Sequence, residues 1–338
     1  MIREAIAALV NERRDLTREE AAAAMTEIMN GEATPSQLGS FLTALRLKGE
    51  SVDELTGMAE VMRRFVLAVP VEGVVVDTCG TGGDNSGTFN VSTAAAFVVA
   101  GAGGRVAKHG NRAMSSHCGS ADVLEALGAR IELTPEQVSQ CISRTGFGFM
   151  FAPAFHPAMK HAAPTRREIG VRTAFNILGP LTNPAGARSQ LMGVPQRDLA
   201  AKMAAVLQSL GCHHALVVNG DGGLDELSLS GPSQVYEVLA GTLREYEVAP
   251  GDVGLSEAPL AAVKGGSAAE NAAQLRNILG GAKGPLRDIV LLNAGAALVA
   301  ADLAVDLPAG VHLAAEAIDS GQALARLDAF VELTRTFE

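Results

Sequence analysis

The sequence predicts an α/β protein in which a small all-helical N-terminal domain precedes a larger α/β domain with a mostly parallel central sheet. Helix-capping signals repeat over the first 66 residues, and short apolar runs then alternate with helical stretches. The chain has 338 residues, more than the ~100 to 200 of one typical domain. Its 48% hydrophobic and 19% charged content excludes wholesale disorder.

The first 66 residues repeat one local signal for the start of a helix. A Ser or Thr is followed three residues later by Glu or Gln at Thr17/Glu20, Thr34/Gln37 and Ser51/Glu54. In such a capping box, the paired side chains satisfy free N–H groups of the first helical turn. Pro35 suits a first helical position, while Gly31 and Gly49 suit helix ends. Residues 1–66 are therefore expected to form a helical domain.

The pattern changes after Pro70 to that of consecutive β-α-β units. Strands are expected at 74–76, 105–107, 147–151, 191–194, 215–218, 235–239 and 243–248, and helices from 91 and at 121–127, 135–144 and 198–210. The breaker cluster 179–184 indicates a crossing between domains. We therefore expect an α/β domain over 71–165 and 185–338, with a segment near 166–184 returning to the helical domain.

Composition excludes several classes of function. The chain has 27 Lys and Arg against 37 Asp and Glu, a formal charge of −10, which repels a nucleic-acid backbone. No run reaches the ~18 apolar residues of a membrane span, and the N-terminus lacks an apolar signal core. The four cysteines form no C-x-x-C pair, and we interpret them as reduced thiols. These features predict a cytoplasmic protein whose partners are neither nucleic acid nor a membrane.

A Gly-rich segment, 77–93, lies between an expected strand and an expected helix. Gly80, Gly82 and Gly83 lack Cβ atoms, so their N–H groups can approach an anion closely, and Asn90–Thr93 would add a helix N-terminus. These features suit a phosphate or pyrophosphate cradle, and a plain Gly-rich loop before a capped helix is the alternative. The segment is neither G-x-G-x-x-G nor a P-loop, which disfavours a dinucleotide or nucleoside-triphosphate fold.

A polar segment, 108–122, follows the next expected strand. Lys108 and Arg112 supply two cations, His109 supplies an imidazole, and several serines supply hydroxyls within a Gly-punctuated turn. This composition suits a multiply charged phosphate ester. A solvated polar loop would explain part of it, and Ser120 could instead cap the helix that follows.

Two further segments carry charge near expected strand ends. The adjacent carboxylates of Asp225 and Glu226 follow a strand and suit Mg²⁺, which binds one or two carboxylates and bridges substrate phosphates. An exposed acidic turn is the alternative. In the stretch after His156, the paired Arg166 and Arg167 are either a solvated helix face or a fork for a substrate carboxylate.

Taken in order, these segments resemble the anthranilate phosphoribosyltransferases, a family of nucleoside-phosphorylase-like phosphoribosyltransferases. The resemblance covers nearly the whole chain and rests on the joint occurrence of G-T-G-G-D, N-x-S-T, K-H-G-N-R, S-S-x-x-G-S-A-D and L-G-P-L-T-N-P. It implies that the amine of anthranilate displaces pyrophosphate from C1 of phosphoribosyl pyrophosphate, a step of tryptophan biosynthesis. It also implies Mg²⁺ as cofactor and a homodimer formed through the helical domain.

The same resemblance implies a set of site residues. Those implied for phosphoribosyl pyrophosphate are Gly80, Gly82, Gly83, Asp84, Thr88, Asn90, Val91, Ser92, Thr93, Lys108, His109, Gly110, Asn111, Arg112, Ser115, Ser116 and Ser120. Those implied for anthranilate are Gly80, His109, Asn111, His156 and Arg166, and those implied for Mg²⁺ are Ser92, Asp225 and Glu226. Lys108, Asn111 and Arg166 are implied as catalytic residues, with Lys108 on the developing pyrophosphate charge and Arg166 on the acceptor carboxylate.

Two alternatives share this architecture. A pyrimidine nucleoside phosphorylase would bind inorganic phosphate and a nucleoside, but the pair Asp225 and Glu226 is useful mainly for a pyrophosphate leaving group. A non-catalytic nucleic-acid-binding relative would keep the fold, but the charge of −10 and the intact phosphate and metal segments disfavour it.

Overall fold

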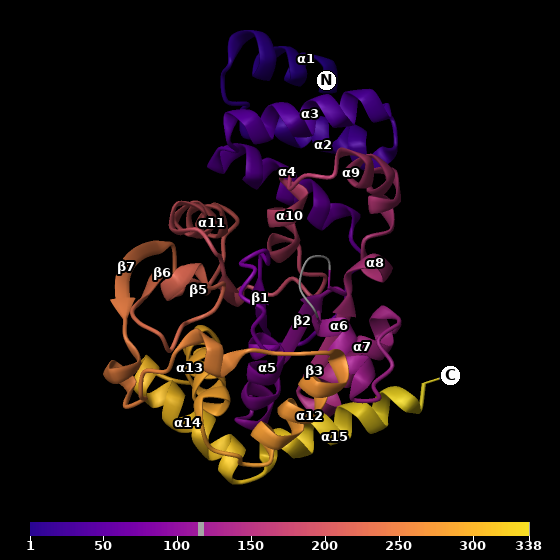
Figure 1. Cartoon of the computed structure of the whole chain (residues 1–338). Helices are drawn as coiled ribbons and strands as arrows, with labels where there is room; N and C mark the ends of the chain where they lie inside the picture. Colours follow the sequence, from indigo (N-terminus) through magenta and orange to yellow (C-terminus); the bar gives the residue numbers. More distant parts are fainter. Residues whose placement is uncertain (114–117, 338) are drawn as a thin grey trace.

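The computed structural model describes residues 1–113 and 118–337. It has the α/β architecture expected from the sequence, with a helical N-terminal domain at the top of Figure 1 and a larger α/β domain below it. A seven-stranded sheet forms the centre of the α/β domain. None of the helices in the described residues combines the length and the apolar character that a membrane span requires.

Short helices, most of them capped, build the N-terminal domain. They are α1 (Ile2–Ala7), α2 (Arg18–Asn30), α3 (Pro35–Lys48) and α4 (Val52–Phe65), with a π-helical turn at Ala8–Glu12. All three expected capping boxes are present, with the side chains of Thr17, Thr34 and Ser51 accepting hydrogen bonds at the helix starts. α2 and α3 end at Gly31 and Gly49, whose φ angles are 76° and 89°. The capping signals therefore predicted these helix boundaries correctly.

The sheet consists of β1 (Val76–Gly80), β2 (Val106–Gly110), β3 (Phe147–Phe151), β4 (Ser189–Gly193), β5 (His214–Asn219), β6 (Ser233–Leu239) and β7 (Thr242–Val248). Their order is β3-β2-β1-β4-β5-β6-β7, in which the first five are parallel and β6 and β7 are antiparallel. β1 differs from the expected 74–76. It begins at Val76 because the buried polar residues Asp77 and Thr78 continue the pairing with β4, whereas Val74 is exposed.

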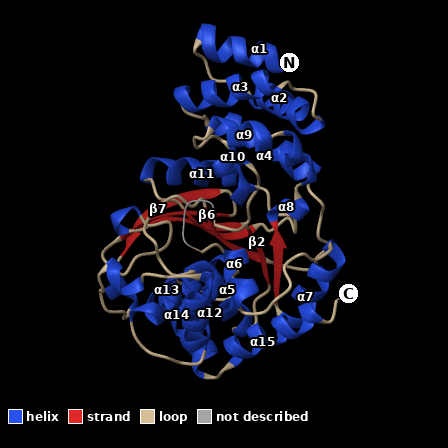
Figure 2. Ribbon diagram, turned by 45° about the vertical axis from the view of Figure 1, so that its right-hand side comes forward, coloured by secondary structure: helices blue, strands red, loops and turns tan. Residues whose placement is uncertain are grey.

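Helices cover both faces of the sheet (Figure 2). The helices after β1 are α5 (Val91–Gly101), α6 (Ser120–Ala126), α7 (Pro135–Thr145), α8 (Ala152–Phe155), α9 (Ala163–Ile169), α10 (Phe175–Leu178), α11 (Arg197–Ser209), α12 (Ala268–Leu279), α13 (Pro285–Ala300), α14 (Leu307–Asp319) and α15 (Gln322–Arg335), of which α9 and α10 lie against the helical domain instead. On one face, Phe97, Phe147 and Phe330 pack with α5, α13 and α15 in one buried core. On the other face, α11 packs on β5 and on α4, which joins the sheet to the helical domain in a second core.

The chain returns to the helical domain between β3 and β4. Along this segment, α9 contacts α3, and α10 contacts α4. At its end, Asn183 Nδ2 donates to Asp77 Oδ2 and to the Ala107 carbonyl oxygen, both at 2.8 Å. Asn183 therefore ties the returning segment to β1 and β2, and so places α9 and α10 over the carboxyl ends of these strands.

Candidate active site

A cavity of about 620 Å³ lies at the carboxyl ends of the parallel strands. β1 ends in the cavity at Gly80, β2 ends there at Gly110, and the loop after β5 brings Asp225 and Glu226 to the same place. β1 pairs with β2 on one side and with β4 on the other, so the chain winds in opposite directions from this strand. Ligand sites of open α/β sheets typically occur at such a switch point.

Nearly all of the predicted site residues in the described part of the chain line this cavity. The lining includes Gly80, Gly82, Gly83, Asp84, Thr88, Asn90, Val91, Ser92, Thr93, Lys108, His109, Gly110, Asn111, Arg112, Ser120, Arg166, Asp225 and Glu226. His156 is not in the lining but contacts His109 from behind. The predicted residues Ser115 and Ser116 lie outside the described residues.

The Gly-rich loop after β1 is held tightly against the acidic turn. The Gly82 N–H donates to Asp225 Oδ2 at 2.9 Å, and Gly82 and Gly83 have φ angles of 66° and 84°. A Cβ atom on Gly80 would lie 2.5 Å from Asp225 Oδ2. Arg172 Nη2 also donates to the Thr81 and Gly82 carbonyl oxygens, at 3.1 and 3.0 Å. Glycine is therefore required here both for backbone conformation and for close approach.

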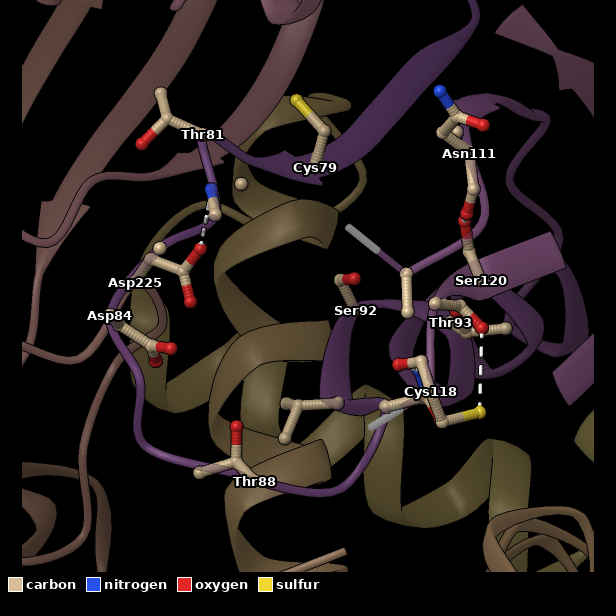
Figure 3. A pocket seen from close by; sticks show the side chains of 18 of the residues that line it. Cys79, Thr81, Asp84, Thr88, Ser92, Thr93, Asn111, Cys118, Ser120 and Asp225 are labelled. Atoms are coloured by element: carbon tan, nitrogen blue, oxygen red, sulfur yellow. Dashed lines mark hydrogen bonds between the residues drawn. The ribbon is translucent and has the colours of Figure 1, made fainter. Parts of the chain in front are cut away.

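Three carboxylates meet on one side of the cavity, where Figure 3 shows Asp84 and Asp225 as neighbours. Burial, followed by the neighbouring Asp84, raises the pKa of Asp225 to about 7. Burial and the nearby Asp225 raise the pKa of Glu226 well above its ordinary value. Asp84 Oδ2 is buried and has no hydrogen-bond partner among the described residues. The site is thus rich in anionic oxygens that a cation would neutralise.

These oxygens fit Mg²⁺ as a hard cation that takes few protein ligands. In the described residues, no three His, Cys, Asp or Glu side chains form a ready-made metal cage. Mg²⁺ does not need one, because it keeps several waters and binds through one or two carboxylates plus substrate phosphates. The buried, unpartnered oxygen of Asp84 and the raised pKa values of Asp225 and Glu226 are the features of this chain that such an ion would relieve.

Lys108 lies at the bottom of the cavity and is 2% exposed. Its Nζ donates to the Thr78 carbonyl oxygen and, at 3.1 Å, to Ser92 Oγ. Burial lowers the pKa of Lys108, and the nearby Asp77 and Glu226 act in the opposite direction. The ammonium is therefore the central cation of a buried network rather than the end of a side chain that reaches into solvent.

Besides Arg172, the cavity lining includes the guanidinium groups of Arg112 and Arg166, which have different surroundings. Arg166 lies over the Phe175 ring, with 5.0 Å between its Cζ atom and the ring centroid, and no carboxylate of the described residues pairs with it. Arg112 instead forms an ion pair with Glu125 and contacts Asp122 at 3.4 Å. Arg112 is thus already engaged by carboxylates, whereas Arg166 is available to an incoming one.

Ser120 does not cap α6, because Gly119 occupies the N-cap position.

His109 and His156 form a neutral pair beside the cavity. Their Nε2 atoms are 3.1 Å apart. Burial and the adjacent His156 lower the pKa of His109 to about 3, and burial lowers the pKa of His156 to about 4. One ring must donate to the other, which requires at least one N–H and fixes the orientation of both rings. The face that His109 presents to the cavity is therefore uncharged near neutral pH.

We expect the histidine pair to make folding stability sensitive to acid. Below pH 6.5, the ordinary pKa of histidine, the unfolded chain binds protons that the folded pair does not, so stability falls as the pH falls from 6.5 toward 4. Thermal midpoints of the parent and of His156→Gln, measured from pH 8 to pH 5, test this. The buried carboxyls give an opposite slope in both proteins, so the difference between the two curves is the readout. Parallel curves would contradict the assignment.

Some lining residues were not predicted. Arg172 follows the paired arginines in the sequence, and its role became visible only through its contacts with the Gly-rich loop. Gly265, Gly266 and Asn271 come from a segment around the start of α12 that crosses the site. The run from Lys264 to Ser267 combines a cation, two glycines and a hydroxyl directly before α12, and this is the sequence signal that could have identified the segment.

Comparison with known proteins agrees with this geometry. The family model described as "Glycosyl transferase family, a/b domain" matches residues 72–324, and the model described as "Glycosyl transferase family, helical bundle domain" matches residues 3–66. The anthranilate phosphoribosyltransferase of Chloroflexus aggregans is 61% identical over 99% of this chain and 98% of that protein. The enzyme of the same name from Chloroflexus aurantiacus is 60% identical, with 99% of both chains covered.

Solved structures give the same result. The anthranilate phosphoribosyltransferase of Thermus thermophilus superimposes with a TM-score of 0.93 at 47% identity, covering 99% of both chains. The Saccharomyces cerevisiae enzyme in complex with PRPP and Mg superimposes with a TM-score of 0.91 at 28% identity, covering 99% of this chain and 98% of that one. Because the similarity extends over the full length of both domains, the chain belongs to the anthranilate phosphoribosyltransferases of the glycosyl transferase family.

Proposed function

We propose that this cavity transfers the 5-phosphoribosyl group from phosphoribosyl pyrophosphate to the amine of anthranilate and releases pyrophosphate, as a step of tryptophan biosynthesis. The observation that supports it most is the convergence of the Gly-rich loop, the start of α5 and the Asp225 and Glu226 carboxylates in one cavity. This combination suits a pyrophosphate together with its cation. The full-length relatives carry the same activity in their names, which decides against the two alternatives raised above.

The phosphate-binding groups are proposed to come from the α/β domain. The Gly80–Asp84 loop and the first turn of α5 would direct N–H groups at phosphate oxygens, with Lys108 as the nearest buried cation. Asp225, Glu226 and Ser92 would hold Mg²⁺, with Asp84 as an additional carboxylate. Mg²⁺, when bound, supplies positive charge to the leaving pyrophosphate. The complex of the yeast enzyme with PRPP and Mg supports these two ligands for this chain.

The acceptor is proposed to lie between Arg166, His109 and Asn111. Anthranilate carries a carboxylate that Arg166 can hold, and its aryl amine is a neutral nucleophile that needs no strong base. The neutral His109 ring would form part of the wall without attracting a second anion. The role of this wall is therefore to orient the amine toward ribose C1. The yeast enzyme was solved in complex with 4-fluoroanthranilate, which supports an aromatic acid as the acceptor.

A fluorescence assay tests the proposed reaction directly. The protein is incubated with phosphoribosyl pyrophosphate, Mg²⁺ and anthranilate, and the loss of anthranilate fluorescence is followed. We expect a loss only when all three are present with the protein. A folded protein that leaves the fluorescence unchanged would overturn the proposal.

Arg166→Ala is expected to weaken the acceptor far more than the phosphoribosyl donor. Loss of one charged hydrogen-bond partner costs about 1.5 to 3 kcal/mol, so KM for anthranilate should rise roughly tenfold to over a hundredfold. KM for phosphoribosyl pyrophosphate should stay nearly constant. Arg167→Ala, on the same helix but exposed, is the matched control. An equal rise of both Michaelis constants would instead assign Arg166 to the phosphate site or to the joint between the domains.

We also propose that the protein is a cytoplasmic homodimer that associates through its helical domain. This domain exposes the apolar side chains of Val10 and Leu47, at 55% and 83%. The four cysteines are free thiols, which suits a reducing compartment. The mass of the protein in solution, measured by sedimentation, tests the dimer, and a monomer at micromolar concentration would contradict it.

A further inference from the structure

The start of α5 has an unusual cap. Asn90 occupies the N-cap position, where an Asn side chain commonly accepts a hydrogen bond from the second or third N–H of the helix. Its side chain makes no such bond. Asn90 Oδ1 instead accepts from Asn271 Nδ2 at 2.9 Å, and Asn90 Nδ2 donates to the Cys118 carbonyl oxygen at 3.0 Å. The natural capping group of this helix is therefore held away from it.

Asn271 is built to hold Asn90 in this way. It is 2% exposed, and its Oδ1 accepts from the Gly266 N–H at 2.7 Å, which leaves Nδ2 to donate to Asn90. Two backbone hydrogen bonds hold the segment that carries Asn271 against the loop before α5. The Gly265 N–H donates to the Gly87 carbonyl oxygen, and the Phe89 N–H donates to the Val263 carbonyl oxygen. Both amide orientations are thus determined by their partners.

The consequence falls on the first turn of α5. The Ser92 N–H donates to Glu226 Oε1 at 3.1 Å, but the Thr93 N–H finds no acceptor among the described residues. Thr93 Oγ1 is also buried and has no partner in the part of the chain that the structure describes, and the residue is 1% exposed and lines the cavity. Figure 3 shows Thr93 beside Ser92 at the start of this helix. Two neighbouring donors at the positive end of an 11-residue helix therefore point to an anionic ligand.

We propose that Asn271 is a positioning residue that keeps Asn90 from capping α5, so that the Thr93 N–H and hydroxyl remain open for a phosphate group of phosphoribosyl pyrophosphate. The inference rests on the proposed function for the identity of the ligand. Without Asn271, the Asn90 side chain would be held only by its bond to the Cys118 carbonyl oxygen, and giving up that one bond would let it accept from the Thr93 N–H, as Asn does at ordinary helix starts. The protein's own side chain would then compete with the substrate for the same donor.

Asn271→Ala is expected to raise KM for phosphoribosyl pyrophosphate about tenfold, the effect of losing one charge-assisted hydrogen bond. KM for anthranilate should change less than twofold. Asn277→Ala, an exposed position on the same helix, is the matched control. Asn271→Asp keeps the acceptor for Gly266 but cannot donate to Asn90, so it should also weaken the donor substrate if the Ala variant does not fold. An unchanged KM for phosphoribosyl pyrophosphate in both variants would overturn the proposal.

A double-mutant cycle separates this role from a merely structural one. Asn90→Gly removes the competing side chain, together with the contact that Asn90 itself is expected to make with the substrate, but keeps a residue that is acceptable at an N-cap, so the effect of Asn271→Ala is read within that background. In that background, Asn271→Ala should raise KM for phosphoribosyl pyrophosphate by less than twofold. If Asn271 only supported the segment around Gly266, the tenfold effect would persist in the Asn90→Gly protein, and the proposal would be wrong.

Binding of inorganic pyrophosphate gives a readout that does not depend on turnover. Millimolar pyrophosphate should raise the thermal midpoint of the parent protein and of Asn277→Ala, and should raise that of Asn271→Ala clearly less. A parent that shows this shift without transferring the phosphoribosyl group would overturn the proposed function alone. Equal shifts in the parent and Asn271→Ala would overturn the role of Asn271 alone.

Discussion

Replacing Asp225 and Glu226 together by Ala is expected to abolish phosphoribosyl transfer at millimolar Mg²⁺. The two carboxylates are the proposed metal ligands. Among the described residues, the only other carboxylate in the cavity lining is that of Asp84. Loss of the cation leaves the leaving pyrophosphate without its main source of positive charge, which commonly contributes several kcal/mol to such reactions. Turnover should fall below detection, and excess Mg²⁺ should not restore it.

The same substitution should leave the fold nearly intact. Burial and mutual repulsion already disfavour both charges, as the raised pKa values of Asp225 and Glu226 indicate. Their removal relieves that repulsion, although the Gly82 and Ser92 N–H groups lose their acceptors. A companion variant, Asp225→Asn with Glu226→Gln, keeps oxygen acceptors and removes only charge. Near-normal turnover in either folded variant, followed by the fluorescence assay, would show that the metal assignment is wrong.

Local chemistry made much of the fold predictable. The capping boxes at Thr17, Thr34 and Ser51 are satisfied within four residues, so they do not depend on the rest of the molecule. The strand 147–151 is apolar, buried at every residue and bounded by Gly146, whose φ is 76°. Prediction of strand boundaries failed where a residue is held by contacts with distant parts of the chain. β1 includes Asp77, a buried carboxyl whose partners Asn183 and His109 are distant in the sequence or on another strand.

In the candidate site, too, the residues with local sequence signals were predictable and those that depend on tertiary contacts were not. Its phosphate-binding loops were predictable because glycine, hydroxyl and cationic residues cluster within two short segments that follow strands, and the cavity brings them together. Asn271 was not predictable, because it acts on Asn90 across 181 residues through a single amide hydrogen bond. The ion pair that surrounds Arg112 could not be predicted from the sequence either. Its ion pair with Glu125 depends on how α6 folds back on the loop.

Lys108→Met is expected to reduce turnover by roughly a hundredfold or more, the range seen when one preorganised donor to developing charge is removed. The sequence alone also allowed a non-catalytic Lys108, whose ammonium extends to solvent at a strand end. The structure excludes that alternative, because Lys108 is 2% exposed and its Nζ contacts the Thr78 carbonyl oxygen and Ser92 Oγ. Lys108 is therefore placed between the proposed metal ligands and the phosphate loop.

The expected loss of turnover must be separated from a loss of stability. Methionine preserves the apolar stem, but it leaves Asp77 and Glu226 without the buried cation that opposes their desolvation. Breaking a buried charge pair in this way typically costs about 3 to 5 kcal/mol, so the thermal midpoint should fall. Rates should be measured well below that midpoint, at saturating substrates and excess Mg²⁺.

Lys108→Arg is the informative companion, because it keeps the charge but cannot place a bulkier, planar guanidinium between Thr78 and Ser92 without displacing them. It should retain more stability than Lys108→Met while still losing most of the turnover, since a displaced cation no longer matches the transition state. A Lys108→Met protein that is folded and works within about twofold of the parent, less than ~0.5 kcal/mol in barrier, would remove Lys108 from the catalytic residues. The buried ammonium would then serve only to balance the charges of Asp77 and Glu226.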